Sequence, residues 1–293
     1  MSEILPKLYK YRYFRDEPVS RNGLPDGEQI PQWHQVLYDG LVFPAAPEDF
    51  NDPYDCDFLI EDTFINSWTA RSMIVTVLLK WFPLSIAEKH NIMNAKDLEK
   101  AIKAVMRKYR ARACRITKED LMKNVELEVR KIKDAVSVAC FSADNSSILM
   151  WSHYAANHTG FCIEYDMNSW YGKRYIKPVI YSDERHYIPG DFADNLTSNP
   201  GRAFMDAALF KSPEWSYEKE WRLIMQRIEL INPQFKGTRP ACFLKDYITA
   251  VYLGVKCSDN YRKQVYEHFK NTNVKVYQME KQTDSYKLVP KIL

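Results

Sequence analysis

Two glutamates and an arginine alternate along the segment Tyr217-Glu-Lys-Glu-Trp-Arg222. On a β-strand, alternate side chains point to the same face, so Glu218, Glu220 and Arg222 are expected to lie side by side. Neighbouring like charges repel, and proteins tolerate that cost chiefly where carboxylates transfer protons or stabilise a positive charge. The spacing therefore predicts a functional site. The alternative is an exposed edge strand on which Lys219 and Arg222 balance the acids.

Residues 140–166 form a second segment rich in polar and aromatic side chains. Its pattern predicts a strand, a helix over residues 147–157 capped by a serine, a tight turn and another strand. One side of the helix must pack, which leaves the other side to face a cleft. Ser142, Trp151, His153 and Tyr154 are candidate site residues in this segment.

The histidines and cysteines show no metal-binding pattern. His153 and His158 are five positions apart, or about 140° around a helix, so they cannot bind one ion together. The six cysteines include no Cys-x-x-Cys pair, and Cys140 and Cys162 lie in apolar runs. We expect buried thiols rather than disulfides or zinc ligands, and no metal site.

Two segments nearer the N-terminus could bind a ligand. In Leu8-Tyr-Lys-Tyr-Arg12, strand alternation places Arg12 on one face and Tyr9 on the other. The Arg12 guanidinium could hold a phosphate or carboxylate through two hydrogen bonds, or it could be a surface residue at a sheet edge. Asn51 and Asp52 fit either a turn that caps its own backbone or a loop that faces a ligand.

These residues must be positioned by helices and strands, and the sequence pattern predicts an α+β fold with a mixed β-sheet core. Strands are expected over residues 8–14, 35–43, 136–142, 160–165, 175–181, 220–226, 248–253 and 274–277, and further helices over residues 203–210 and 259–270. Apolar residues at helical spacing over residues 64–134 predict a helical insertion, so that residues 1–293 form a single α+β domain. No repeating β-α-β unit with a glycine-rich turn is present, which argues against a doubly wound nucleotide-binding fold.

Composition limits the class of protein. Among 293 residues, 46% are hydrophobic and 14% aromatic, enough for a large core. The 41 basic and 38 acidic side chains leave a net charge of +3, so no global field would draw the chain onto nucleic acid or anionic lipid. The first residues contain no apolar run typical of a signal peptide, and no segment is long enough to span a membrane. A cytoplasmic protein is expected.

The polar segments, in this order, resemble a bacterial family known as domain of unknown function 2971. The resemblance rests on Leu8-Tyr-Lys-Tyr-Arg12, Phe50-Asn-Asp-Pro-Tyr-Asp55, Met150-Trp-Ser-His-Tyr154, Gly160-Phe-Cys-Ile-Glu-Tyr-Asp166 and Tyr217-Glu-Lys-Glu-Trp-Arg222. It extends over most of the chain outside the helical insertion, and it implies no established activity.

A weaker resemblance is to ADP-ribosyltransferases, which carry an arginine or histidine, then a serine or tyrosine, then Glu-x-Glu on successive elements. Arg12, Ser142 and Glu218-Lys-Glu220 follow that order, although Ser142 lies in Phe-Ser-Ala rather than Ser-Thr-Ser. The resemblance implies an ADP-ribosyltransferase-like fold that uses NAD as its substrate, and a setting in toxins or phage defence.

The resemblance also implies a role for each residue. Cleavage of the nicotinamide bond passes through an oxocarbenium-like sugar, which Glu220 would stabilise while Glu218 orients or deprotonates the acceptor. Arg12 would hold pyrophosphate or ribose, His153 would orient ribose or phosphate, and Tyr154 or Trp151 would stack on nicotinamide. The other expected substrate-binding residues are Tyr9, Asn51, Asp52, Ser142 and Arg222.

Three functions remain open from the sequence. The first is an ADP-ribosyltransferase or NAD glycohydrolase acting on a protein, a nucleic acid or water. The second is a nucleotide- or nucleic-acid-binding module without catalysis, in which Arg12, His153 and the aromatic side chains bind phosphate and bases. The third is a nuclease that uses His153 with Glu164 or Asp166, which lacks further metal ligands.

Overall fold

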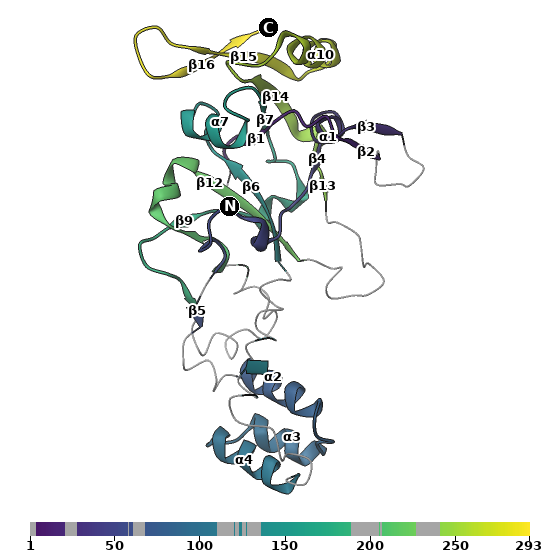
Figure 1. The fold of residues 1–293 in the computed structure, drawn as a ribbon, viewed down its shortest axis with the longest axis vertical. Helices are drawn as coiled ribbons and strands as arrows, with labels where there is room; N and C mark the ends of the chain where they lie inside the picture. Colours follow the sequence, from purple (N-terminus) through teal and green to yellow (C-terminus); the bar gives the residue numbers. More distant parts are fainter. Residues whose placement is uncertain are drawn as a thin grey trace. The chain divides into compact units, whose positions relative to one another are not determined.

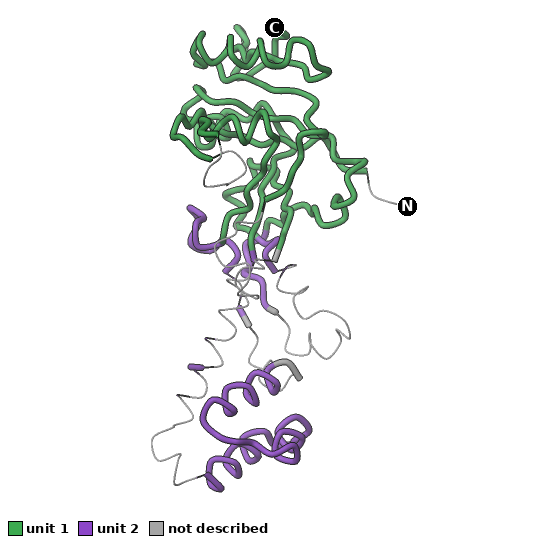
Figure 2. Tube along the Cα trace, turned by 90° about the vertical axis from the view of Figure 1, so that its right-hand side faces the viewer, with its two compact units in different colours: residues 1–46, 137–181, 211–293 green, residues 47–136, 182–210 purple. Residues whose placement is uncertain are grey.

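A computed structural model describes residues 4–20, 28–57, 59–60, 68–109, 120, 123–124, 127, 136–188, 205, 207–226 and 241–293. The chain divides into two compact units (Figure 2). Unit 1 comprises residues 1–46, 137–181 and 211–293, and unit 2 comprises residues 47–136 and 182–210. The organisation as one domain with an insertion at residues 64–134 stays a prediction.

Unit 1 is built on an eight-stranded sheet in the order β16-β15-β14-β7-β1-β6-β12-β8 (Figure 1). Its strands are β1 (Leu8–Arg12), β6 (Val136–Ser142), β7 (Phe161–Tyr165), β8 (Ile176–Pro178), β12 (Glu220–Gln226), β14 (Ile248–Leu253), β15 (Lys275–Lys281) and β16 (Leu288–Ile292). β14 and β15 run parallel, whereas β1 is antiparallel to both β6 and β7. A mixed sheet accompanied by helices confirms the predicted α+β class.

The pairing of β1 with β7 defines the two faces of the sheet, because directly paired residues point to the same side. Leu8 pairs with Tyr165 on one face, here called the Leu8 face, and Tyr9 pairs with Glu164 on the other, the Tyr9 face. Helices α1 (Gln32–Leu37) and α10 (Asp259–Phe269) pack on the Leu8 face through Trp33, Leu37, Val265 and Phe269. Helix α7 (Ile148–Tyr154) packs on the Tyr9 face through Met150 and Trp151.

Helix α7 begins and ends for local reasons. The Ser147 hydroxyl accepts a hydrogen bond from the backbone N–H of Met150 at 3.3 Å, which caps the first turn. Ala156, Asn157 and His158 then have φ angles of 46°, 53° and 70°, in the left-handed region that a helix cannot use. The helix is therefore shorter than the predicted residues 147–157.

Short two-stranded ribbons flank the sheet, and one predicted strand is a helix. The ribbons pair β2 (Pro18–Ser20) with β3 (Gln29–Pro31), β4 (Leu41–Val42) with β13 (Cys242–Phe243), and β9 (Ile180–Tyr181) with β11 (Phe210–Lys211). The strand expected over residues 35–43 is wrong in its first half. Residues 35–37 belong to helix α1 instead. Trp33 and Leu37, four positions apart, lie on one side of this helix and pack into the core. The helix expected over residues 203–210 falls largely outside the described residues.

Unit 2 contains helices α2 (Trp68–Leu79), α3 (Ile86–Met93) and α4 (Leu98–Lys108), which surround their own core, and the parallel pair β5 (Leu59–Ile60) and β10 (Tyr187–Ile188). Its short 3-10 helix η2 spans Pro47–Asp49. Ser85 and Glu88 form a capping box at the start of α3, and Asp97 caps α4. None of the described helices is long and apolar enough to cross a bilayer.

Candidate functional site

Four charged side chains meet inside unit 1, on Lys211, Glu218, Glu220 and Arg222, and are called here the buried charge cluster. The Lys211 amino group lies 2.6 Å from Glu218 Oε2 and 3.0 Å from Glu220 Oε2. Arg222 donates to both oxygens of Glu220, from Nε at 2.8 Å and from Nη2 at 3.0 Å. The side chains are at most 4% exposed. Two acids are thus balanced by two cations away from water.

The backbone around Lys219 explains how both carboxylates reach Lys211. Glu218 is the last residue of the 3-10 helix η5 (Pro213–Glu218), Lys219 is left-handed with φ 45° and ψ 50°, and Glu220 begins β12. The expectation that Glu218 alternates with Glu220 along one strand is therefore wrong. The exposed-edge alternative is wrong as well, because β12 lies between β6 and β8.

Neighbouring elements hold the two acids through hydrogen bonds. The Tyr154 hydroxyl on α7 donates to Glu218 Oε1 at 2.6 Å, and Ser142 Oγ on β6 donates to the Glu218 carbonyl at 2.6 Å. The backbone N–H of Glu220 donates to the Tyr181 hydroxyl at 2.9 Å. The cluster and its partners therefore join helix α7 and four strands, β6, β9, β11 and β12. Ser142 acts here as a backbone anchor.

The two carboxylates have opposite electrostatic environments. Burial raises the pKa of Glu218 above its ordinary value, despite the nearby charge of Lys211 and the hydrogen bond from Tyr154. Burial also acts on Glu220, but the charge and hydrogen bonds of Arg222, followed by the charge of Lys211, lower its pKa to about 2. Glu220 is therefore held ionised, whereas Glu218 takes up a proton more readily. Such a division between neighbouring carboxylates is typical of acid–base sites.

Arg12 does not belong to the buried charge cluster. It pairs directly with Phe161 of β7, a residue of the core on the Leu8 face. Leu223 on β12 packs into that same core, so alternation directs Glu220 and Arg222 to the Tyr9 face. The resemblance to ADP-ribosyltransferases implies that Arg12 and Glu220 act on one substrate; this expectation is wrong, because the sheet lies between them.

Trp151 differs from the role expected for it, whereas the role of His153 stays a prediction. Trp151 is fully buried, its indole N–H donates to the Asn145 carbonyl at 2.8 Å, and its ring packs edge-on against Tyr11. It is a core residue and cannot stack on a ligand in this structure. His153 is exposed on α7, with its ring centroid 6.3 Å from that of Tyr217.

Tyr9 belongs to a second polar group on the same face, centred on Glu164. The Glu164 carboxylate accepts hydrogen bonds from Tyr9 at 3.2 Å, Tyr252 at 2.7 Å and Thr249 at 2.6 Å. The amino group of Lys7 lies 3.5 Å from it. Three hydroxyl groups and the Lys7 amino group therefore hold Glu164 on this face of the sheet. Among the described residues, no group of three or more His, Cys, Asp or Glu side chains is arranged to hold a metal ion.

Asn51 and Asp52 lie in unit 2. Asp52 Oδ1 accepts a hydrogen bond from the backbone N–H of Tyr54 at 2.9 Å, as the turn interpretation requires. Asn51 is exposed. Their role in ligand binding stays a prediction.

Sequence reasoning missed Lys211, Tyr181 and Cys140. Burial raises the pKa of the Cys140 thiol, which also hydrogen-bonds Glu220. In the sequence, Lys211 is distinguished only by the apolar residues 207–210 that precede it. Its two partners follow seven and nine positions later, a spacing that no regular element predicts.

Comparison with known proteins supports the family and nothing more specific. Residues 150–223 match a family model described as "Protein of unknown function (DUF2971)". No curated protein and no solved structure matches the chain. The matched segment holds Tyr154, Glu218, Glu220 and Arg222 and excludes Arg12. The match of residues 150–223 to this model supports the resemblance to the DUF2971 family that the sequence motifs indicated.

Proposed function

We propose that the buried charge cluster is the catalytic centre of a cytoplasmic enzyme that cleaves the bond between nicotinamide and ribose in NAD. The products are nicotinamide and an ADP-ribosyl group carried to water, a protein or a nucleic acid. The observation behind the proposal is that two neighbouring carboxylates have pKa values shifted in opposite directions: Arg222 and Lys211 hold Glu220 ionised, whereas burial raises the pKa of Glu218.

The two acids divide the reaction between them. As the C1′–N bond breaks, nicotinamide leaves with the bonding electron pair and positive charge develops on the ribose. The fixed negative charge of Glu220 opposes that charge. Water or an acceptor hydroxyl then attacks C1′, and ionised Glu218 accepts the proton that it loses. Tyr154, which donates to Glu218, orients that carboxylate.

Arg12 has no part in this proposal, because it lies on the other face of the sheet. Arg222 is directed at Glu220 and positions it. His153, exposed on α7, remains the residue proposed to contact ribose or phosphate. A toxin or phage-defence role follows from the chemistry, because an enzyme that consumes NAD removes a cofactor that all cells need.

A nucleotide-binding module without catalysis is the second candidate. It is favoured by the complete pairing of the cluster, in which side chains at most 4% exposed already compensate one another. A cluster of this kind can stabilise a fold around a binding surface without touching substrate. The module would bind nucleotide phosphates with an affinity that falls steeply as salt rises.

Nicotinamide release from NAD distinguishes the two candidates. We expect release by the wild-type chain and a loss of roughly 10²–10³ in rate for Glu218→Gln, which keeps the size of the side chain and removes the proton acceptor. Glu214→Gln is the matched control, because Glu214 lies on the same 3-10 helix and is exposed. Wild-type chain that binds ADP-ribose but never consumes NAD, with or without acceptors, would favour the binding module.

A further inference from the structure

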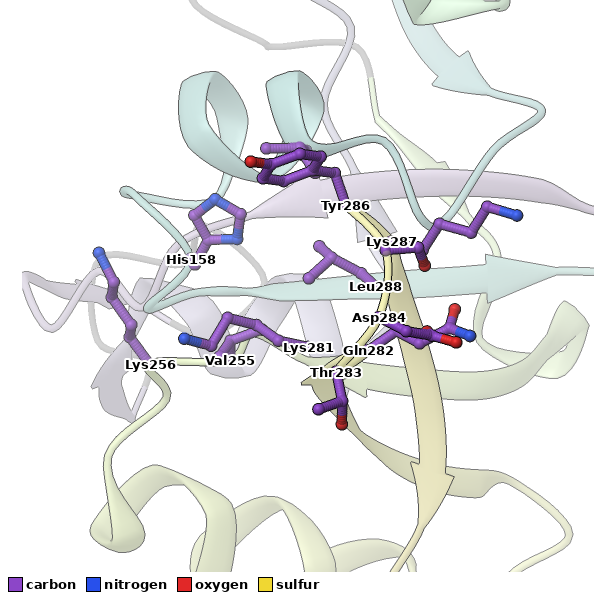
Figure 3. Close-up of a pocket in the computed structure, with 12 residues that line it drawn as sticks. His158, Val255, Lys256, Lys281, Gln282, Thr283, Asp284, Tyr286, Lys287 and Leu288 are labelled. Carbon is purple, nitrogen blue, oxygen red and sulfur yellow. The ribbon is translucent and has the colours of Figure 1, made fainter.

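A cavity of about 830 Å³ lies on unit 1 between the start of α7 and the hairpin that joins β15 to β16 (Figure 3). Its volume is in the range of small-molecule sites. The lining residues are Ile148, His158, Val255, Lys256, Lys281, Gln282, Thr283, Asp284, Ser285, Tyr286, Lys287 and Leu288. The buried charge cluster contributes no residue to it.

Positive charge is concentrated at one end of this cavity. Figure 3 shows the amino groups of Lys256 and Lys281 on the side of His158, whereas the side chain of Lys287 extends away from them. Asp284, the one acid among the lining residues described, lies toward Lys287. Lys256 and Lys281 are both exposed and line the cavity. Two ammonium groups at one end of a cavity favour an anion.

His158 contributes a hydrogen-bond acceptor to the same end. Ser152 Oγ lies 2.9 Å from the Ile148 carbonyl oxygen and 3.1 Å from His158 Nε2. When its single hydrogen is donated to the carbonyl, Nε2 carries the imidazole proton and donates to Ser152, and Nδ1 carries a lone pair. Nδ1 is buried and has no hydrogen-bond partner within the described structure. Burial and the charge of Lys256 lower the pKa of His158, which favours this neutral form.

The backbone fixes His158 in place. His158 is the third of three consecutive left-handed residues, and its carbonyl accepts from the Lys256 N–H at 2.9 Å. Gly254 makes that approach feasible, since a Cβ there would lie 2.2 Å from the His158 carbonyl oxygen. Left-handed residues other than glycine are costly and tend to occur at functional sites. The turn therefore presents His158 and Lys256 as one rigid pair.

We propose that this cavity binds a small phosphomonoester that also carries a hydroxyl group, of the size of a nucleoside monophosphate. Lys256 and Lys281 bind the phosphate, and His158 Nδ1 accepts a hydrogen bond from the hydroxyl. The side chains of Ile148, Val255 and Leu288 supply an apolar wall. The site is separate from the one proposed for NAD cleavage.

Calorimetric titration with AMP tests the proposal, because AMP has no nicotinamide bond and its binding does not depend on NAD cleavage. We expect the affinity for AMP to fall roughly tenfold or more in Lys256→Ala and again in Lys281→Ala. Lys287→Ala, at the other end of the cavity, should bind as the wild type does. Both lysines are exposed, so melting temperatures should be unchanged.

Competition identifies the groups that the cavity recognises. Inorganic phosphate should compete with AMP, whereas adenosine, which lacks the phosphate, should not. His158→Phe should weaken AMP more than inorganic phosphate, because it removes the acceptor for the hydroxyl. Failure of AMP to bind, or equal loss of affinity in Lys256→Ala and Lys287→Ala, would overturn the proposal. Loss of AMP binding in Glu218→Gln would also contradict it, by placing the ligand at the other site.

Discussion

Glu220 and Arg222 form a two-point ion pair inside the sheet of unit 1, with Nε to Oε1 at 2.8 Å and Nη2 to Oε2 at 3.0 Å. Both residues lie on one strand, two positions apart, and Arg222 is fully buried. Glu220 also forms an ion pair with Lys211, which lies on another strand, β11. The cluster therefore has to be tested for its part in folding as well as in catalysis.

Glu220→Gln is expected to destabilise the fold by about 3–5 kcal/mol, because it leaves Arg222 and Lys211 buried without their shared counter-charge. Urea unfolding followed by circular dichroism measures this loss. Glu280→Gln is the matched control, since Glu280 forms an exposed pair with Lys291 and its loss should cost within about 1 kcal/mol. An equal, small effect of both substitutions would show that Arg222 finds another partner.

The acid stability of the chain should depend on Glu220. Its pKa is about 2 in the folded chain, against an ordinary value of 4.5. The unfolded chain therefore binds the proton first, and the stability that Glu220 provides is complete above about pH 4.5 and is lost as the pH falls toward 2. Glu218, whose pKa is raised, contributes with the opposite sign. Free energies of unfolding from pH 6 to pH 2 should fall more steeply for wild type than for Glu220→Gln.

Lys10 should make stability rise with pH in the alkaline range, as Glu220 does in the acid range. Burial, followed by the charge of Arg12, lowers its pKa to about 7 from an ordinary value of 10.5. Between these values the unfolded chain binds more protons, so the stability of the wild type should rise with pH from about 7 to 10.5. Lys10→Met should remove this rise while losing the hydrogen bond to the Cys140 carbonyl. Parallel pH profiles of the two chains would contradict the prediction.

Tyr154→Phe tests the contact between α7 and the buried charge cluster. It removes the hydroxyl that donates to Glu218 at 2.6 Å and leaves the ring in place. We expect a loss of about 1.5–3 kcal/mol in unfolding free energy, as for hydrogen bonds to charged groups. Tyr217→Phe, on the 3-10 helix η5, is the matched control, because it also removes a tyrosine hydroxyl and keeps the ring. If the NAD proposal holds, the rate of nicotinamide release should also fall in Tyr154→Phe and stay unchanged in Tyr217→Phe.

The sequence by itself determined the class of the fold and many of its strands. The alternation in Leu8-Tyr-Lys-Tyr-Arg12 predicts the two faces of β1 that the pairing with β7 shows. The segment from Tyr217 to Arg222 was singled out by its neighbouring acids, which meet in the buried charge cluster. These features are visible in the sequence because strand alternation and like-charge spacing are local properties of the chain.

Only the tertiary structure decided which residues meet. Arg12 and Glu220 lie on opposite faces because the register of β1 against β7 and the alternation of β12 fix their directions. Lys211 joins Glu218 and Glu220 through a 3-10 helix and a left-handed residue, neither of which the sequence pattern indicates. Burial depends on the whole fold, and the difference in pKa between two glutamates of one sequence motif depends on burial and on partners brought from other elements.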